Sequence, residues 1–142
     1  MKIILVNGPN LNLLGTREPK IYGNRSFVQY FEELKTKFPA IDLVYFQSNH
    51  EGELIDFIQK EGNSSQGLVI NAGGFTHTSV ALADAISAVS LLAIEVHISN
   101  IFARESFRHH SYLSPVCKGV ICGLGLYGYQ AAIDFIIQNS GK

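Results

Sequence analysis

Five short apolar runs, separated by segments with helical periodicity, constrain the fold of this chain more than any other feature. The runs are rich in Val, Ile and Leu and predict strands at residues 2–6, 42–46, 67–70, 91–96 and 119–122. Strands that are apolar along their whole length are typical of a parallel sheet that helices cover on both faces. With right-handed crossovers, the pattern predicts a doubly wound α/β fold.

Four amphipathic segments predict the helices of the two outer layers. They are residues 26–38, a segment that opens at 48–51 and closes at Gly62, residues 76–88 and residues 124–138. Ser26 and Gln29 have the spacing of a capping box, and so do Ser48 and Glu51. The expected architecture is therefore a flavodoxin-like three-layer sandwich around a five-stranded parallel sheet.

The composition predicts one compact domain spanning residues 1–142, of which 46% are hydrophobic and 16% charged. The formal charge of −1 gives no reason to expect a nucleic-acid partner. No apolar stretch is long enough to span a membrane, and the run 3–6 is too short for a secretion signal. Cys117 and Cys122 are expected to be buried as small hydrophobic residues, which favours a reducing, cytoplasmic location.

Polar side chains gather where the first, third and fourth predicted strands end. The candidates that follow these strands are Asn10, Arg17 and Tyr22, then Asn71 and His77, then His97, Ile98, Ser99 and Arg108. Ligands of parallel sheets bind beyond the carboxyl ends of the strands, so one edge should hold a site. All arginines lie within residues 17–25 and 104–108, which suits a small anion. Residues 11–25 are far longer than a connection needs, which is typical of a mobile lid loop.

Arg17 and Tyr22 suggest a base within this lid loop. A free tyrosine has a pKa near ~10, so only about a thousandth is phenolate at neutral pH. An arginine about 4 Å away, at an effective dielectric near ~20, is worth about 4 kcal/mol, or roughly two to three pKa units. The spacing alone fits a surface tyrosine beside a solvated arginine equally well.

Glu95 and His97 suggest an acid. They alternate with Val96 at a strand end, so both side chains lie on the same face of the sheet. Glu95 is then placed to accept a hydrogen bond from one imidazole nitrogen, which fixes the tautomer and keeps the ring protonated as a general acid. A structural histidine beside a solvated carboxylate fits the spacing equally well.

Two further positions are candidates for ligand contacts. Backbone N–H groups at Ile98 and Ser99, just past the fourth strand, form a natural cradle for a carboxylate. Asp84 lies two turns beyond His77 on a comparable face of the predicted helix, where a solvated charge is the simpler interpretation.

Two patterns favour structure over cofactor or metal binding. The glycines of Gly123-Leu124-Gly125-Leu126-Tyr127-Gly128 match a dinucleotide-binding turn, but no strand or ribose-binding acid follows. Tight turning and close helix packing explain them better. His97, His109 and His110 lack a second carboxylate or a cysteine at ligand spacing. We therefore expect neither a cofactor nor a metal.

Several sequence blocks occur together in a fixed order. They are Asn7-Gly8-Pro9-Asn10-Leu11-Asn12-Leu13-Leu14-Gly15, Arg17-Glu18-Pro19, Tyr22-Gly23, Asn71-Ala72-Gly73, Thr76-His77-Thr78-Ser79, Glu95-Val96-His97, Ser99-Asn100-Ile101, Arg108-His109-His110-Ser111 and Lys118-Gly119-Val120-Ile121. With these blocks the chain resembles the type II 3-dehydroquinate dehydratases over essentially its whole length. Many independent blocks in one order make the resemblance specific.

The resemblance implies anti elimination of water from 3-dehydroquinate, through an enolate, to 3-dehydroshikimate on the route to chorismate and the aromatic amino acids. It implies that Tyr22 is the base and that Arg17 promotes its phenolate. Asn10 would hold a water near the enolate oxygen, and His97, partnered by Glu95, would protonate the departing hydroxyl. The substrate-binding positions would be Asn71, His77, Asp84, Ile98, Ser99 and Arg108. Members of this family assemble as dodecamers built from trimers, and Asp84 resembles the family's acid that also reaches a neighbouring subunit's site.

A second hypothesis comes from a different class of protein: a non-catalytic flavodoxin-like domain that binds a nucleotide or phosphate. Neither an arginine–tyrosine lid nor a glutamate–histidine strand end is needed merely to hold phosphate. We therefore favour the dehydratase hypothesis.

Overall fold

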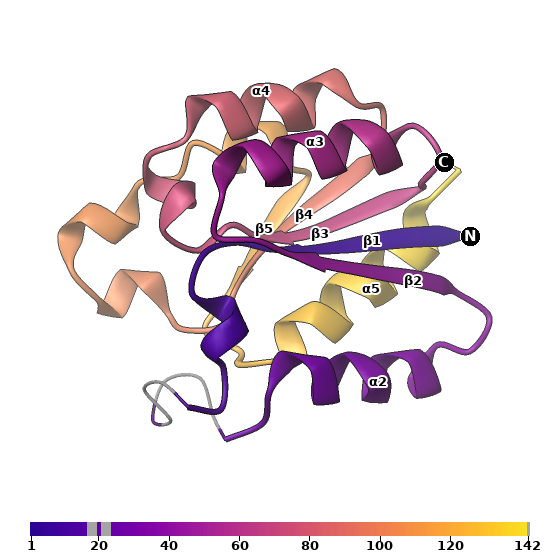
Figure 1. The fold of residues 1–142 in the computed structure, drawn as a ribbon, viewed down its shortest axis with the longest axis horizontal. Helices are drawn as coiled ribbons and strands as arrows, with labels where there is room; N and C mark the ends of the chain where they lie inside the picture. The colour runs from indigo at the N-terminus through magenta and orange to yellow at the C-terminus, as the bar shows by residue number, and fades with distance from the viewer. Residues whose placement is uncertain (17–19, 21–23, 142) are drawn as a thin grey trace.

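The computed structural model describes residues 1–16, 20 and 24–141. One parallel sheet has the strand order β2-β1-β3-β4-β5, which confirms the predicted flavodoxin-like topology. Its strands are β1 Lys2–Asn7, β2 Asp42–Gln47, β3 Gly67–Asn71, β4 Leu92–His97 and β5 Gly119–Cys122. The helices are α2 Phe27–Lys37, α3 Glu51–Gly62, α4 Val80–Ala88 and α5 Tyr127–Asn139. Helices α3 and α4 cover one face of the sheet, and α2 and α5 cover the other (Figure 1).

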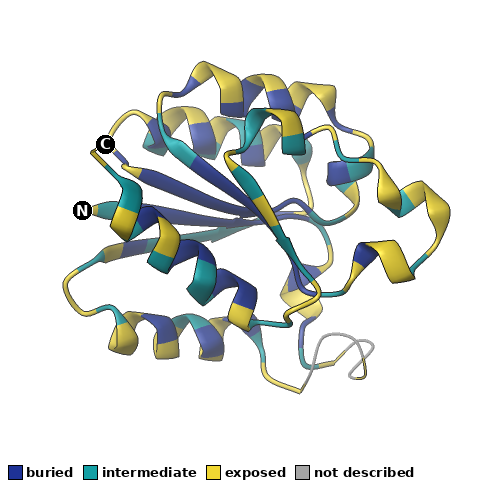
Figure 2. Cartoon of the chain, turned by 180° about the vertical axis from the view of Figure 1, so that it is seen from behind, coloured by how far each residue is buried: buried dark blue, intermediate teal, exposed yellow. Residues whose placement is uncertain are grey.

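The sheet separates two apolar cores, because successive strand residues point to opposite faces. From β1, Ile3 and Leu5 pack toward α2 and α5, whereas Ile4 and Val6 pack toward α3 and α4. All four side chains are fully buried. Figure 2 shows the same pattern along the helices, whose buried residues face the sheet. Burial of each such side chain is worth about 1.5–3 kcal/mol.

Four strands, β1 to β4, end on polar residues, one position later than the sequence pattern predicts. Asn7 pairs in register with Asn71, and His97 pairs with Cys122. Asn7, Asn71 and His97 are buried. A buried polar side chain needs hydrogen-bond partners, so these strand ends require a local polar network.

The sequence predicts two capping boxes, and the structure bears out one of them. The Ser26 capping box is confirmed: Ser26 Oγ accepts from the Gln29 N–H at 3.2 Å, and the Gln29 side chain accepts from the Ser26 N–H at 3.2 Å. The box at Ser48 was wrong. Ser48 Oγ accepts from the His50 N–H at 2.9 Å and bonds Glu53, because α3 begins only at Glu51 with His50 at its N-cap.

Helix α4 also begins later than residue 76. Residues Gly73–His77 form a separate 3-10 helix, η2, and Ser79 then caps α4 by accepting from the Leu82 N–H at 2.9 Å. Gly73 has a left-handed backbone (φ 58°), which turns the chain away from α-helical geometry at this point. His77 and Asp84 therefore lie on different helices, and the shared face expected for them was wrong.

The glycine-rich turn after β5 has the structural role that the sequence predicts. Gly123 and Gly125 have positive φ angles of 84° and 60°, and α5 starts three residues later than expected. A Cβ on Gly128 would lie 3.2 Å from Val96 Cγ1, so this glycine lets α5 approach the sheet closely. The structure therefore explains these glycines by turning and packing.

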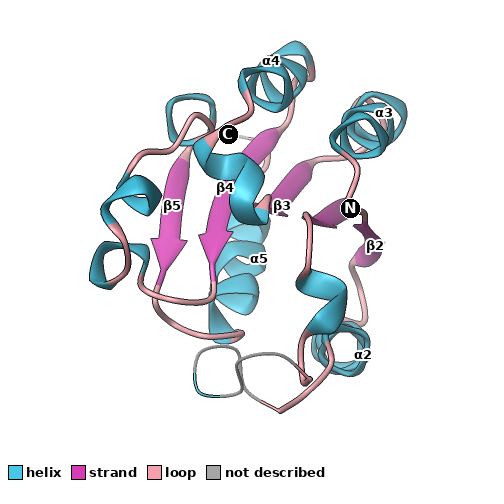
Figure 3. Ribbon diagram, turned by 60° about the vertical axis from the view of Figure 1, so that its left-hand side comes forward, coloured by secondary structure: helices cyan, strands magenta, loops and turns pink. Residues whose placement is uncertain are grey.

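Between β4 and β5, residues 98–118 project beyond the sheet edge (Figure 3). This segment contains three 3-10 helices: η3 Ile101–Ala103, η4 Ser106–His109 and η5 Ser114–Val116. Cys117, near its end, and Cys122, on the edge strand β5, are free thiols, and both are only partly buried, less than the sequence analysis predicts. In the described part of the chain, no helix is long and apolar enough to cross a membrane.

The packing predicts a sharp difference between two glycine substitutions. A Cβ on Gly8 would lie 2.2 Å from the Ala72 carbonyl oxygen, whereas a Cβ on Gly52 would have no atom within 4 Å. Gly8→Ala should lower the free energy of unfolding by about 1–3 kcal/mol through overpacking. Gly52→Ala, within α3, should raise it by up to about 1 kcal/mol. Urea unfolding of both variants tests this, and equal stabilities would contradict it.

Candidate active site

The carboxyl ends of β1 and β3 are held together by a buried amide–phenol network. Tyr129 from α5 accepts from Asn71 Nδ2 at 2.9 Å and donates to Asn7 Oδ1 at 2.8 Å. Asn71 Oδ1 in turn accepts from the Gly73 N–H at 3.2 Å. Tyr129 is 0% exposed, and burial raises its pKa far above the usual range despite these hydrogen bonds. Tyr129 therefore acts as a neutral bridge that fixes both strand ends.

The turn after β1 is fixed from β2 as well. Gln47 Nε2 donates to the Gly8 carbonyl at 3.1 Å, and Asn49 Oδ1 accepts from the Asn10 N–H at 3.0 Å. Asn10 itself adopts a left-handed backbone with φ 70°, which asparagine tolerates better than most residues. The end of β2 thus holds Gly8, and Asn49 just after it holds Asn10, a contribution that sequence patterns did not reveal.

At the end of β4, Glu95 and His97 form a buried pair. Glu95 is 0% exposed, and its Oε1 lies 2.7 Å from His97 Nε2. Glu95 Oε1 also accepts from Ser111 Oγ at 2.8 Å, and its Oε2 accepts from Ser114 Oγ. Burial alone would raise the pKa of Glu95, but the hydrogen bonds from His97, Ser114 and Ser111 and the imidazolium charge together lower it. Glu95 is therefore held as a carboxylate.

His77 and His97 present their rings to the same space. The two rings lie nearly parallel at 18°, with centroids 6.3 Å apart. His77 Nδ1 lies 2.7 Å from the His110 carbonyl oxygen, so Nδ1 carries a proton and donates it. His97 directs Nε2 to Glu95, which leaves its Nδ1 as the nitrogen for a ligand.

A pocket opens beyond this edge of the sheet, over the ends of β1, β3 and β4. It is lined by Pro9, Asn10, Leu11, Leu13, Leu14, Asn71, Gly73, Gly74, His77, His97, Ile98, Ser99, Ile101, Arg104 and Arg108. Arg104 Nη1 donates to Ser99 Oγ at 3.2 Å, and Arg108 Nε pairs with Glu105 at 2.7 Å. The pocket thus combines two guanidinium groups with two histidines and two amides, which suits a polar ligand with negative charge.

The structure brings most of the predicted site residues together, but not all. Asn10, Asn71, His77, His97, Ile98, Ser99 and Arg108 line one pocket, and Glu95 lies directly behind it. Asp84 is exposed on α4 and does not line the pocket. Arg17 and Tyr22 lie outside the described residues. Across residues 1–16, 20 and 24–141, no group of three or more His, Cys, Asp or Glu residues could hold a metal ion.

Some of the contacts that build the site carried no periodic signal in the sequence. Ser111 and Ser114 contact Glu95 from 16 and 19 positions away, and Tyr129 contacts Asn71 from 58 positions away. No helical or strand periodicity links residues so distant. Arg104, by contrast, was visible in the arginine cluster near Arg108.

Comparisons with known proteins agree over nearly the whole chain. Residues 1–137 match the family model for dehydroquinase class II. A 3-dehydroquinate dehydratase of Dinoroseobacter shibae is 53% identical over 138 residues, 96% of this chain and 92% of the relative. A catabolic 3-dehydroquinase of Phaeosphaeria nodorum is 53% identical over 139 residues, 96% of this chain and 91% of the relative. The crystal structure of a type II dehydroquinase from Butyrivibrio crossotus matches with a TM-score of 0.91 and 49% identity, over 96% of this chain and 97% of that chain.

The amide–phenol network predicts a specific loss of stability. Tyr129→Phe removes one hydroxyl and leaves Asn7 Oδ1 and an Asn71 N–H unpaired in the core, so the free energy of unfolding should fall by about 1–3 kcal/mol. Tyr127→Phe, on the same helix but 56% exposed, is the control and should change stability little. Thermal or urea unfolding measures both. A Tyr129→Phe variant as stable as the wild type would contradict the assigned role.

Proposed function

The chain belongs to the class II dehydroquinases, the hydro-lyases that dehydrate 3-dehydroquinate, and we propose that it does so by anti elimination through an enolate to 3-dehydroshikimate. The observation that carries this proposal is the buried Glu95–His97 pair at the wall of a pocket lined by arginines. A protonated imidazole held by a buried carboxylate, beside arginines that can bind the substrate carboxylate, suits the loss of a hydroxyl from an anionic ring.

His97 is the proposed acid. Glu95 accepts from Nε2 and stabilises the imidazolium, so the proton on Nδ1 faces the pocket. That proton passes to the departing hydroxyl, which leaves as water when the C–O bond breaks and the enolate electrons form the new C=C bond. After the step His97 is neutral, and its Nε2–H remains bonded to Glu95.

We assign the removal of the proton beside the ketone to the lid loop, residues 11–25. Tyr22 is the proposed base that takes the proton beside the ketone, and Arg17 is proposed to stabilise its phenolate. Both assignments come from the resemblance described above, since both residues lie outside the described part of the chain. We also assign Asn10, whose backbone N–H donates to Asn49, to hold a water against the enolate oxygen, which would lower the cost of forming that negative charge.

Substrate binding is assigned to the rest of the pocket wall. Ile98 and Ser99 offer backbone N–H groups past β4, and Arg104 donates to Ser99 Oγ and so adds positive charge to the same corner. We assign this corner to the substrate carboxylate. His77 bonds the His110 carbonyl through Nδ1, so we assign its other nitrogen, Nε2, to a ring hydroxyl. Asn71 and Arg108 are assigned to the remaining oxygens.

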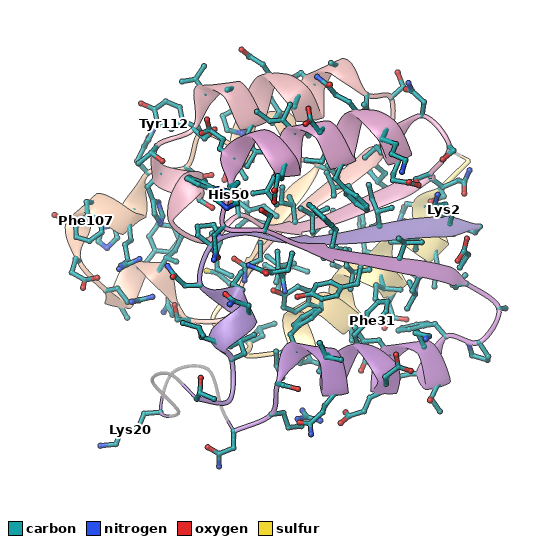
Figure 4. The ribbon with its side chains drawn as sticks, in the orientation of Figure 1. Lys2, Lys20, Phe31, His50, Phe107 and Tyr112 are labelled. Atoms are coloured by element: carbon teal, nitrogen blue, oxygen red, sulfur yellow. The ribbon has the colours of Figure 1, made fainter. Side chains whose placement is uncertain are left out.

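We also infer a homo-oligomer, a dodecamer built from trimers. Phe102 and Phe107 are 61% and 62% exposed on the segment that projects from the sheet edge, and Phe107 stands at its outer end (Figure 4). Asp84, exposed on α4, is free to reach a neighbouring subunit's pocket in such an assembly. Light scattering should give about twelve times the 15.6 kDa of one chain. A monomer would contradict the assembly and leave Asp84 without a role in the site.

The proposed pathway is biosynthetic, from 3-dehydroquinate toward chorismate. We propose that the protein works in the cytoplasm, as a single domain over residues 1–142, and needs no cofactor. Relatives with similar identity include a catabolic 3-dehydroquinase, so sequence similarity supports either direction of use. Deleting the gene in its source should make growth depend on added aromatic amino acids. Growth without them, combined with loss of growth on quinate, would favour the catabolic role.

A spectrophotometric assay tests the proposed reaction directly. Dehydration creates a conjugated enone, so ultraviolet absorbance should rise when the wild-type protein meets 3-dehydroquinate. His97→Ala should lower kcat by about a hundredfold to ten-thousandfold, the usual contribution of a general acid, and Tyr22→Phe should abolish turnover while substrate still binds. His50→Ala at the start of α3, whose side chain makes no capping bond, is the control and should keep full activity.

The same assay separates a dehydratase from a domain that only binds a nucleotide or phosphate. A flavodoxin-like domain that only binds a nucleotide would give no change in absorbance with 3-dehydroquinate, and the purified protein would carry the spectrum of bound nucleotide or flavin. Turnover that survives intact in both His97→Ala and Tyr22→Phe would instead remove the assigned acid and base.

A further inference from the structure

The carboxylate of Glu95 is enclosed by donors from one short segment of chain. Ser111 Oγ lies 2.8 Å from Oε1, the oxygen that also receives His97 Nε2, and Ser114 Oγ bonds Oε2. Neither serine lines the pocket. Both belong to the segment between β4 and β5 that also binds η2, where the Tyr112 N–H donates to the Thr76 carbonyl at 2.9 Å.

The hydrogen bonds of Ser111 determine in which direction it bonds Glu95. Ser111 Oγ accepts from the Leu113 N–H at 3.1 Å and from the Ser114 N–H at 3.0 Å. Its lone pairs are thus occupied, and its single hydrogen is left to donate to Glu95 Oε1. Because His97 donates to the same oxygen, a proton on Oε1 would leave no acceptor between these groups. The surroundings of Oε1 therefore exclude a proton on that oxygen.

We propose that Ser111 and Ser114 are positioning residues of the acid: their hydroxyls hold Glu95 ionised, which fixes the proton of the buried pair on His97 and directs Nδ1 into the pocket. This inference rests on the proposed dehydration and deepens it. With the hydroxyls gone, the buried carboxylate loses donors that bulk water does not replace. The pair then holds its proton on Glu95 over a wider range of pH, and fewer molecules present a charged His97 opposite an ionised Glu95.

Other titratable groups also face the pair. The His77 ring stacks on His97 from η2, and Arg104 and Arg108 line the pocket from the projecting segment. Cys117 lies close enough for the Glu95 charge to act on it. Burial first, and that charge second, raise the pKa of the Cys117 thiol to about 12, so it stays protonated at neutral pH. The Cys117 thiol therefore does not titrate together with Glu95.

The first arm of the test measures the Glu95 carboxyl itself. Carbon-13 NMR of the labelled carboxyl against pH gives its pKa in the full-length protein, without reference to catalysis. Ser111→Ala and Ser114→Ala should each raise that pKa by about one unit or more, the size expected for a lost hydrogen bond to a buried charge. Ser114→Thr, which keeps a hydroxyl, should return the pKa toward the wild-type value.

The matched control is Ser79→Ala. Ser79 is also a buried serine, but its hydroxyl caps α4 by accepting from Leu82, so the variant loses stability without touching Glu95. Its Glu95 pKa should equal that of the wild type. A Glu95 pKa that is unchanged in both Ser111→Ala and Ser114→Ala would overturn the proposal.

The second arm follows dehydration against pH in the same variants. The acid limb of the kcat profile should move to higher pH together with the Glu95 pKa, while KM stays near the wild-type value, because the serines do not line the pocket. A raised carboxyl pKa with an unmoved acid limb would overturn the positioning role. If the wild type does not dehydrate 3-dehydroquinate at all, the proposed function fails, and the NMR arm still decides whether the serines hold the carboxylate.

Discussion

The buried carboxylate of Glu95 is the constraint on which the site depends. An ionised group with no exposed surface costs several kcal/mol to desolvate unless its oxygens receive good hydrogen bonds. In this chain the donors come from His97 on the same strand and from Ser111 and Ser114 on the segment after it. The hydrogen bonds from Ser111 and Ser114 to this carboxylate therefore hold the projecting segment against β4, on one side of the pocket.

The opposite side of the pocket depends on neutral hydrogen bonds. Tyr129 bridges Asn7 and Asn71, so helix α5, from the far end of the chain, sets the spacing of the β1 and β3 ends. The two networks differ in kind, because one holds a charge and the other holds dipoles. The end of β4 thus carries the ionisable pair, whereas the ends of β1 and β3 carry neutral amides.

How far the sequence predicts this molecule depends on the range of the interactions. Apolar runs predict all five strands and their parallel pairing, and the two-residue period predicts the contact of Glu95 with His97. Contacts made at long separation, such as those of Ser111 and Tyr129, leave no periodic signal. Helix α4 does not begin at residue 76 as predicted, because a left-handed Gly73 and a separate 3-10 helix precede it, and both features are decided by tertiary packing.

A crystal structure with an unreactive carboxylated cyclic analogue tests most directly whether the proposed base of the lid loop and the proposed acid on β4 act across one bound ring. We expect the Tyr22 hydroxyl and His97 Nδ1 on opposite faces of the ring, each within about 3.2 Å of the atom it serves, or one water away. We also expect the analogue's carboxylate at Ile98 and Ser99, with Glu95 still bonded to Nε2. An analogue bound with Tyr22 remote from the ring, or with His97 turned away from it, would contradict the account.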